Sequence, residues 1–110
     1  MEINKIAEGK KLTVELIGRL DAVTAIELQE DLKDSLDEVE NLIFDLAKLN
    51  YIASAGLRVL LKYQKHFDKL SGEMEIKNVK TEVRDVLDMT GFSNFLNIID
   101  SPAKKLSIEF

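Results

Sequence analysis

The first twenty residues alternate between apolar and polar side chains. In residues 11–17 every second residue is apolar, which is the period of a half-buried strand. Residues 1–7 look like a second strand, and the sequence Glu8-Gly9-Lys10 between the two segments predicts a hairpin turn. Residues 18–21 break the pattern, so we expect the second strand to end before them.

Residues 22–39 change to the spacing of an amphipathic helix, with apolar side chains at intervals of three or four residues. These apolar positions are Ala25, Leu28, Leu32, Leu36 and Val39. Two starts of the helix fit the sequence. Either Asp21 is the N-cap, or Thr24 is the N-cap and forms a capping box with Glu27.

The rest of the chain repeats a strand followed by a helix. The nearly continuous apolar run at 41–46 is typical of a central strand buried on both faces. A helix is expected at about 55–70, and Ser71-Gly72 ends it because glycine is a natural helix stop. After it we expect a strand at 73–79, a helix at 80–90 ending at Gly91, a short strand at 95–99 and the start of a terminal helix at 102–106.

This order, β-β-α-β-α-β-α-β with a possible terminal helix, predicts the α/β class. Strands that alternate with crossover helices form a largely parallel sheet, to which the first hairpin adds an antiparallel pair. The chain has 110 residues and no linker-like segment, so we expect one domain over residues 1–110. In such sheets, functional residues gather where strands lead into helices.

Composition narrows the choice of partners. The formal net charge is −5, which argues against nucleic acid and anionic membrane, because both favour a basic surface. The chain lacks cysteine, which excludes disulfides and thiolate metal sites. No apolar run reaches the roughly 18 residues of a membrane span, and the first residues lack a signal-peptide core, so we expect a cytoplasmic protein.

No catalytic motif is evident. Ser54 lies at a predicted strand-to-helix turn, but the G-x-S-x-G pattern of hydrolases is absent because residue 52 is Ile52. The only histidine, His66, is about 18 Å further along the same predicted helix at 1.5 Å per residue. The carboxylates at 31–38 fit the solvated face of a helix, and no phosphate-binding glycine motif occurs. We therefore expect no enzyme activity, no metal and no cofactor.

Residues 50–58, N-Y-I-A-S-A-G-L-R, place an isolated serine among very small residues. Ser54 can be a helix N-cap, which is worth about 1 kcal/mol. Capping does not explain the small neighbours Ala53, Ala55 and Gly56, which suggest a shallow surface that a partner can approach closely. A phosphate on Ser54 would meet the positive end of the helix and add about −1.5 to −2 charges to that surface.

Three segments resemble the anti-sigma factor antagonists of the STAS domain family. The sequence F-D-L-A-K-L-N-Y-I-A-S-A-G-L-R-V-L-L is similar to the segment that carries the phosphorylated serine of that family. G-R-L-D at 18–21 resembles the family's G-x-L-D segment, and V-R-D-V-L-D-M-T-G-F resembles its third helix and the Gly-aromatic step that follows. The resemblance covers the whole chain and has the same order of elements.

The resemblance implies a regulatory protein that is not an enzyme. Such a protein binds an anti-sigma factor that is also a serine kinase, and so releases a sigma factor. The kinase phosphorylates the matching serine, here Ser54, and the complex dissociates until a phosphatase removes the phosphate. The resemblance also places Asp21 beside the phosphorylated serine. The expected partner-binding residues are Asp21, Asn50, Ala53, Ser54, Ala55, Gly56 and Arg58.

One departure from the family pattern and two alternatives remain open. Many members of the family have aspartate immediately before the serine, whereas this chain has Ala53, which bears on how efficiently Ser54 is phosphorylated. Arg58 is either a solvated helix residue or a contact for the partner. The alternative function is a STAS-type domain that senses or scaffolds a small molecule, such as a nucleotide or a lipid.

Overall fold

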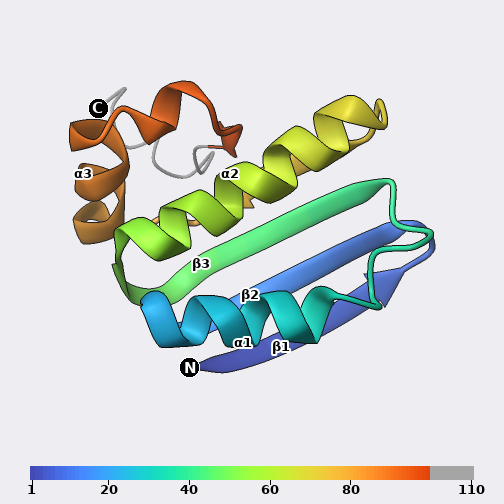
Figure 1. Cartoon of the computed structure of the whole chain (residues 1–110), viewed down its shortest axis with the longest axis horizontal. Coiled ribbons are helices and arrows are strands. Elements are labelled where there is room, and N and C mark those ends of the chain that lie inside the picture. The colour runs from blue at the N-terminus through green and yellow to red at the C-terminus, as the bar shows by residue number, and fades with distance from the viewer. Residues whose placement is uncertain (100–110) are drawn as a thin grey trace, which may run out of the picture.

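The computed structural model describes residues 1–99, which form a five-stranded sheet with helices packed against it (Figure 1). The elements are β1 (Glu2–Glu8), β2 (Lys11–Leu20), α1 (Ala22–Leu32), β3 (Asn41–Ile52), α2 (Ser54–Lys69), β4 (Glu73–Lys77), α3 (Thr81–Met89), a 3₁₀ turn (Phe92–Asn94) and β5 (Ile98–Ile99). The terminal helix expected at 102–106 lies outside the described residues.

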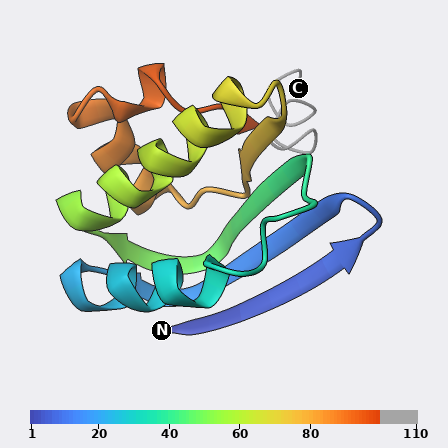
Figure 2. The ribbon, with the colours of Figure 1, turned by 45° about the vertical axis from the view of Figure 1, so that its right-hand side comes forward.

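The sheet has the mixed topology that the order of elements predicts. Its strands lie in chain order, with β1 antiparallel to β2 and every later neighbouring pair parallel. Crossovers between neighbouring parallel strands are almost always right-handed, which places the connecting helices on one face of the sheet. Figure 2 shows α1 and α2 side by side over β2 and β3. The α/β class and the mixed, largely parallel sheet are thus confirmed.

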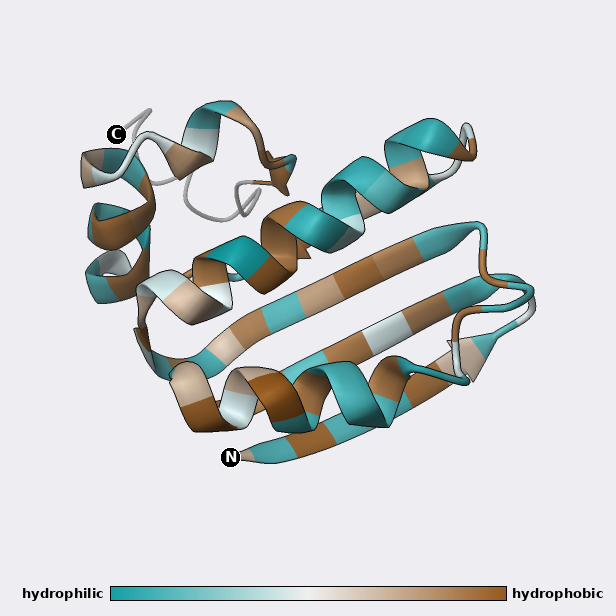
Figure 3. Cartoon of the chain, viewed as in Figure 1, coloured by the Kyte–Doolittle hydropathy of each residue, from teal (hydrophilic) through white to brown (hydrophobic). Residues whose placement is uncertain are grey.

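Hydrophobic burial holds this layer of helices on the sheet. Strands β2 and β3 carry bands of apolar residues beneath α1 and α2 (Figure 3). The largest fully buried side chains are Phe44, Phe67, Leu16, Leu20, Leu28, Leu32, Leu42, Leu46, Leu49, Leu57, Leu60 and Met74. All but Met74 of β4 come from β2, β3, α1 and α2. This shared core therefore fixes the positions of the two helix starts relative to the ends of the two strands.

Strand β3 is longer than the expected segment 41–46, because its apolar period changes twice. Between Glu15 and Ile17, β2 advances by two residues while its partner β3 advances by three. A second shift of the register falls between Gly18 and Arg19. The inward residues are therefore Leu42, Phe44, Leu46, Leu49 and Ile52. Each bulge adds one residue and moves the next inward position from two residues away to three.

Strand β2 also continues beyond its expected end, to Leu20. Gly18 adopts φ +108°, a left-handed conformation that glycine accepts, and still pairs with Leu49. Leu20 pairs with Ile52 and is fully buried. Pairing with β3 thus keeps residues 18–20 in the sheet although their sequence departs from strand alternation.

Helix α1 is shorter than the expected segment 22–39. After Leu32 the backbone forms turns, with Ser35 N–H donating to the Leu32 carbonyl at 3.0 Å. The N–H groups of Glu40 and Asn41 then both donate to the Lys10 carbonyl, which brings the chain back beside β2. The side chains at 36 and 39 still pack on the core. Their helix-like spacing therefore arises from packed turns.

The carboxyl-terminal elements are close to expectation. The strand expected at 73–79 is β4 at 73–77, and the helix expected at 80–90 is α3 at 81–89, followed by Gly91 with φ +80°. The strand expected at 95–99 is only Ile98–Ile99, because residues 92–94 form a 3₁₀ turn. In the part of the chain that the structure describes, no helix is long and apolar enough to span a bilayer.

Candidate functional site

Two helices begin at the same edge of the sheet. Leu20 ends β2 and is followed by Asp21 and α1, while Ile52 ends β3 and is followed by Ala53 and α2. The two strand ends are joined by a hydrogen bond from Ala53 N–H to the Leu20 carbonyl, at 2.9 Å. Because neighbouring strands are about 4.8 Å apart, this bond holds Asp21 and Ser54 at adjacent helix starts.

Ser54 is the first residue of α2 and not its N-cap. The N-cap is Ala53, whose carbonyl accepts a hydrogen bond from Leu57 N–H at 3.0 Å and whose side chain has no oxygen to cap the helix. The alternative that Ser54 serves as the N-cap is therefore wrong. Its side chain is exposed and hydrogen-bonds to none of residues 1–99. The hydroxyl thus points into solvent beside the amino end of the helix.

Gly56 has a structural role rather than a surface role. It is buried, and an added Cβ would lie 2.7 Å from Leu20 Cγ and 3.0 Å from the Leu20 carbonyl oxygen. The expectation that Gly56 contributes an accessible surface needs correction, because its missing side chain lets α2 approach the end of β2. Ala53 and Ala55 are half-buried and remain available to a partner.

Asp21 is the N-cap of α1, which decides between the two starts that the sequence allowed. Its Oδ1 accepts hydrogen bonds from Val23 N–H at 3.1 Å and Thr24 N–H at 3.0 Å. Its own N–H donates to Thr24 Oγ1 at 2.8 Å, so the capping box joins Asp21 with Thr24, not Thr24 with Glu27. The Thr24 N–H bond is the main cause that lowers the pKa of the Asp21 carboxyl below its usual value.

The lowered pKa of Asp21 predicts a pH effect on stability. A carboxyl whose pKa is lower in the folded state stabilises the fold above its unfolded pKa of about 3.9. That contribution disappears as the pH falls through the folded pKa. Asp21→Asn keeps a capping oxygen but cannot titrate, so its melting temperature should fall less steeply below pH 4 than that of the unaltered chain.

Thermal unfolding, followed by circular dichroism at a series of pH values over about five pH units from acid to neutral, checks this. Asp21→Ala is the matched control because it removes the capping oxygen altogether. It should melt several degrees lower than Asp21→Asn at neutral pH. Equal melting temperatures for the two variants would contradict the capping role of Asp21.

Asn50 and Lys80 join the site from further along the sheet. Lys80 Nζ donates a hydrogen bond to Asn50 Oδ1 at 2.6 Å, which links the end of β3 to the N-cap residue of α3. Asn50 and Arg58 are both exposed, as a partner contact requires. Lys80 was not among the residues expected from sequence. Thirty positions separate it from Asn50, and no local pattern reveals such a pair.

His66 is too far from Ser54 to act as a base for its hydroxyl. His66 lies on the same continuous helix α2, twelve residues further on, and its ring packs edge-on against Phe67 at 5.4 Å. Twelve residues correspond to about 18 Å along a helix. Over residues 1–99, no three His, Cys, Asp or Glu side chains gather as a metal would require. The arrangement presents an exposed hydroxyl for modification or contact.

Comparison with known sequences identifies relatives over most of the chain. The STAS domain profile matches residues 2–104. BtrV of Bordetella bronchiseptica, which is described as a candidate anti-sigma factor antagonist, is 33% identical over 78% of this chain and 75% of BtrV. The anti-sigma F factor antagonist of Paenibacillus polymyxa is 31% identical over 87% of this chain and 84% of that protein.

Comparison with solved structures supports the same fold. The anti-sigma factor antagonist SpoIIAA in its unphosphorylated form superposes with a TM-score of 0.78 at 16% identity, over 96% of this chain and 92% of SpoIIAA. The phosphorylated form of SpoIIAA from Bacillus superposes with a TM-score of 0.72 at 14% identity, over 98% of both chains. At these identities, the superpositions bear on the fold alone.

Proposed function

The chain belongs to the STAS domain family, among the anti-sigma factor antagonists, and we propose that phosphorylation of Ser54 switches off its binding to an anti-sigma factor. The observation that carries this proposal is the exposed Ser54 hydroxyl at the amino end of α2, without a hydrogen bond to the rest of residues 1–99. A structural hydroxyl would be buried or bonded, whereas a modified one must be accessible.

The proposed partner is an anti-sigma factor that is also a serine kinase in the bacterial cytoplasm. It transfers the γ-phosphoryl group of ATP to Ser54 Oγ, so that a new P–O bond forms, the bond to ADP breaks and the hydroxyl proton is released. The chain is the substrate in this step and supplies no catalytic group. A phosphatase hydrolyses the phosphoserine and restores the binding form. SpoIIAA, which has been solved in unphosphorylated and phosphorylated forms, is consistent with this cycle.

The site explains how a phosphate can be added without unfolding α2. The first N–H groups of a helix have no partner within it, and the helix dipole favours negative charge there. A phosphate on the first residue therefore meets favourable electrostatics within the chain. The same added charge lies beside the half-buried Ala53 and Ala55, where it would have to be desolvated against a partner.

A phosphorylation assay tests the proposal. The chain is incubated with ATP and the host's anti-sigma factor kinase, and intact-mass and peptide mass spectrometry then locate the phosphate. We expect one phosphate per chain, on Ser54, and none on the Ser54→Ala variant. The exposed Ser71, at the far end of α2, provides the control Ser71→Ala, which should be phosphorylated like the unaltered chain. Unchanged phosphorylation of Ser54→Ala would contradict the proposal.

A further inference from the structure

The exposed face of α2 carries most of the helix's positive charge. Four cations lie on it, at Arg58, Lys62, Lys65 and Lys69, and all are exposed. Asp68 is the only carboxylate in the helix, while the whole chain has a formal net charge of −5. Positive charge is therefore concentrated on one helix of an acidic protein.

The four cations share one side of the helix with Ser54. They follow Ser54 at intervals of three or four residues, and residues at these intervals lie on the same face of a helix. The half-buried Leu61 lies between them. The four cations border a shallow depression along this face together with Leu61, His66 and Asp68. We call Arg58, Lys62, Lys65 and Lys69 the basic stripe.

The basic stripe is not neutralised by the described part of the chain. Within residues 1–99, the ion pairs found involve Lys5, Lys10, Lys33, Lys48 and Arg84, and no carboxylate lies within 4.0 Å of a cation of the stripe. Lys62 Nζ donates to the neutral amide oxygen of Gln29 at 3.0 Å. These four cations, which lack an ion pair, repel one another on one face of the helix. An acidic partner would relieve this repulsion.

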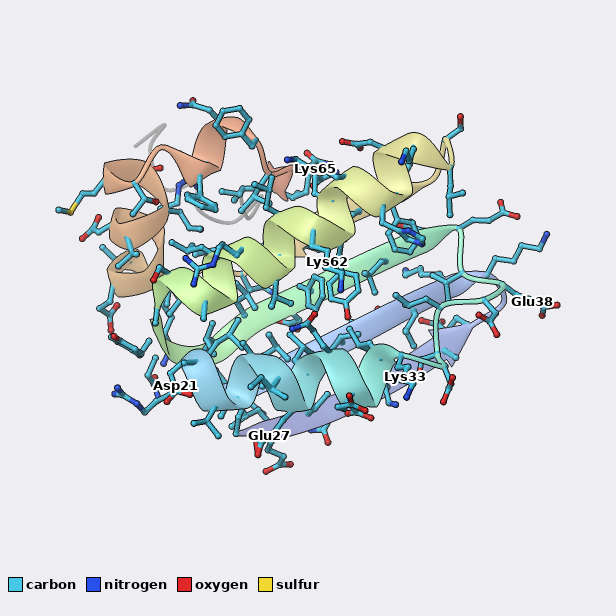
Figure 4. All side chains as sticks on the ribbon, in the orientation of Figure 1. Asp21, Glu27, Lys33, Glu38, Lys62 and Lys65 are labelled. Carbon is cyan, nitrogen blue, oxygen red and sulfur yellow. The ribbon has the colours of Figure 1, made fainter. Side chains whose placement is uncertain are left out.

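Asp68 borders the same depression, whereas a larger group of acidic side chains lies on a different element, α1 and the turns after it. Figure 4 shows Glu27 and Glu38 on α1 and the turns after it, and Lys62 and Lys65 on α2. The other carboxylates of that region are Glu30, Asp31, Asp34, Asp37 and Glu40. Helix α2 therefore has a net positive charge in a chain whose net charge is negative, a contrast that can steer an acidic partner towards α2.

We propose that the basic stripe is a docking surface for acidic side chains of the kinase that phosphorylates Ser54. The inference rests on the proposed function and extends the contact region from the strand ends along the whole exposed face of α2. A protein partner is favoured over nucleic acid or membrane because the rest of this chain is acidic and would repel a larger polyanion.

The position of Ser54 at the head of the stripe gives the phosphate a second effect. Arg58 lies one helical turn after Ser54, so a phosphate of about −1.5 to −2 charges faces the first cation of the stripe. The phosphate then competes with the acidic partner for that cation. Phosphorylation thereby weakens docking through charge neutralisation as well as through contact at Ser54.

Charge reversal of the stripe tests this inference. The variant Lys65→Glu/Lys69→Glu is compared with Lys10→Glu/Lys11→Glu, which changes the net charge equally but lies at the β1–β2 hairpin, at the opposite end of β2 from the site. The probe is the host's purified kinase, already shown to phosphorylate the unaltered chain. Binding is measured by titration calorimetry over a series of salt concentrations.

We expect the stripe variant to bind at least about tenfold more weakly at low salt and to lose most of the salt dependence of the dissociation constant. The hairpin variant should change the affinity less than about twofold.

Equal affinities for the stripe variant and the unaltered chain would overturn the inference while leaving Ser54 phosphorylation intact. A stripe variant that loses affinity only for a short DNA duplex or for phosphatidylserine vesicles would overturn it too. Failure of the kinase to bind or phosphorylate the unaltered chain would instead remove the proposed function.

Discussion

Gly56→Ala destabilises the domain and displaces the start of α2. The added Cβ would lie 2.7 Å and 2.9 Å from the side chain of Leu20 and 3.0 Å from its carbonyl oxygen. The side chain of Leu20 is fully buried and its backbone is held in β2, so neither can move freely. We expect a loss of about 1–3 kcal/mol in the free energy of unfolding, measured by urea denaturation.

A double-mutant cycle separates this contact from the intrinsic effect of alanine in a helix. Alanine alone favours a helix over glycine by about 0.8–1.0 kcal/mol, so any net destabilisation must come from the contact. In a Leu20→Ala background the side-chain clash is removed, and Gly56→Ala should there cost less or even stabilise. The same loss in both backgrounds would contradict the close approach of α2 to Leu20.

A negative charge on Ser54 should weaken partner binding without unfolding the chain. Ser54→Asp places a carboxylate at the first residue of α2, where the helix dipole stabilises it by about 0.3–1 kcal/mol. The melting temperature should therefore stay equal or rise. Binding to the anti-sigma factor should weaken at least about tenfold, because the carboxylate must be desolvated beside the half-buried Ala53 and Ala55.

The neutral variant Ser54→Asn is the matched control, since asparagine has nearly the shape of aspartate. It should bind the anti-sigma factor more tightly than Ser54→Asp, and the difference should shrink at high salt. Calorimetry gives the affinities, and thermal melting shows that each variant is folded. A Ser54→Asp protein that unfolds at a lower temperature than Ser54→Asn would show that Ser54 acts through stability instead.

The sequence predicted the order of elements well, and its errors have physical causes. Alternation identified β2, and a nearly continuous apolar run identified the start of β3, but the two bulges in β3 then changed the inward period from two residues to three. The apolar pattern expected of a regular strand therefore stops at Leu46, although the strand itself continues. Conversely, the helix-like spacing of Leu36 and Val39 extended α1 too far, because packed turns can place apolar side chains as a helix does.

The site was predicted in part, because its residues come from separate segments. Ser54 and Asp21 were expected from the resemblance, and pairing of β2 with β3 holds the two helix starts together. The link from Lys80 to Asn50 depends on the ends of β3 and α3 meeting in space, which no local pattern shows. The basic stripe has a regular helical spacing, and a search for charge on the predicted helix face would have found it.

The most direct test measures the affinity of the anti-sigma factor for two forms of this chain, one unmodified and one carrying phosphoserine at position 54. Incorporation of phosphoserine during translation gives a homogeneous sample, so the measurement does not depend on how efficiently the kinase acts beside Ala53. The account predicts that the unmodified chain binds at least about 100-fold more tightly, a difference of about 2.7 kcal/mol, while both forms melt at similar temperatures. Equal affinities of the two folded forms would contradict a switch at Ser54.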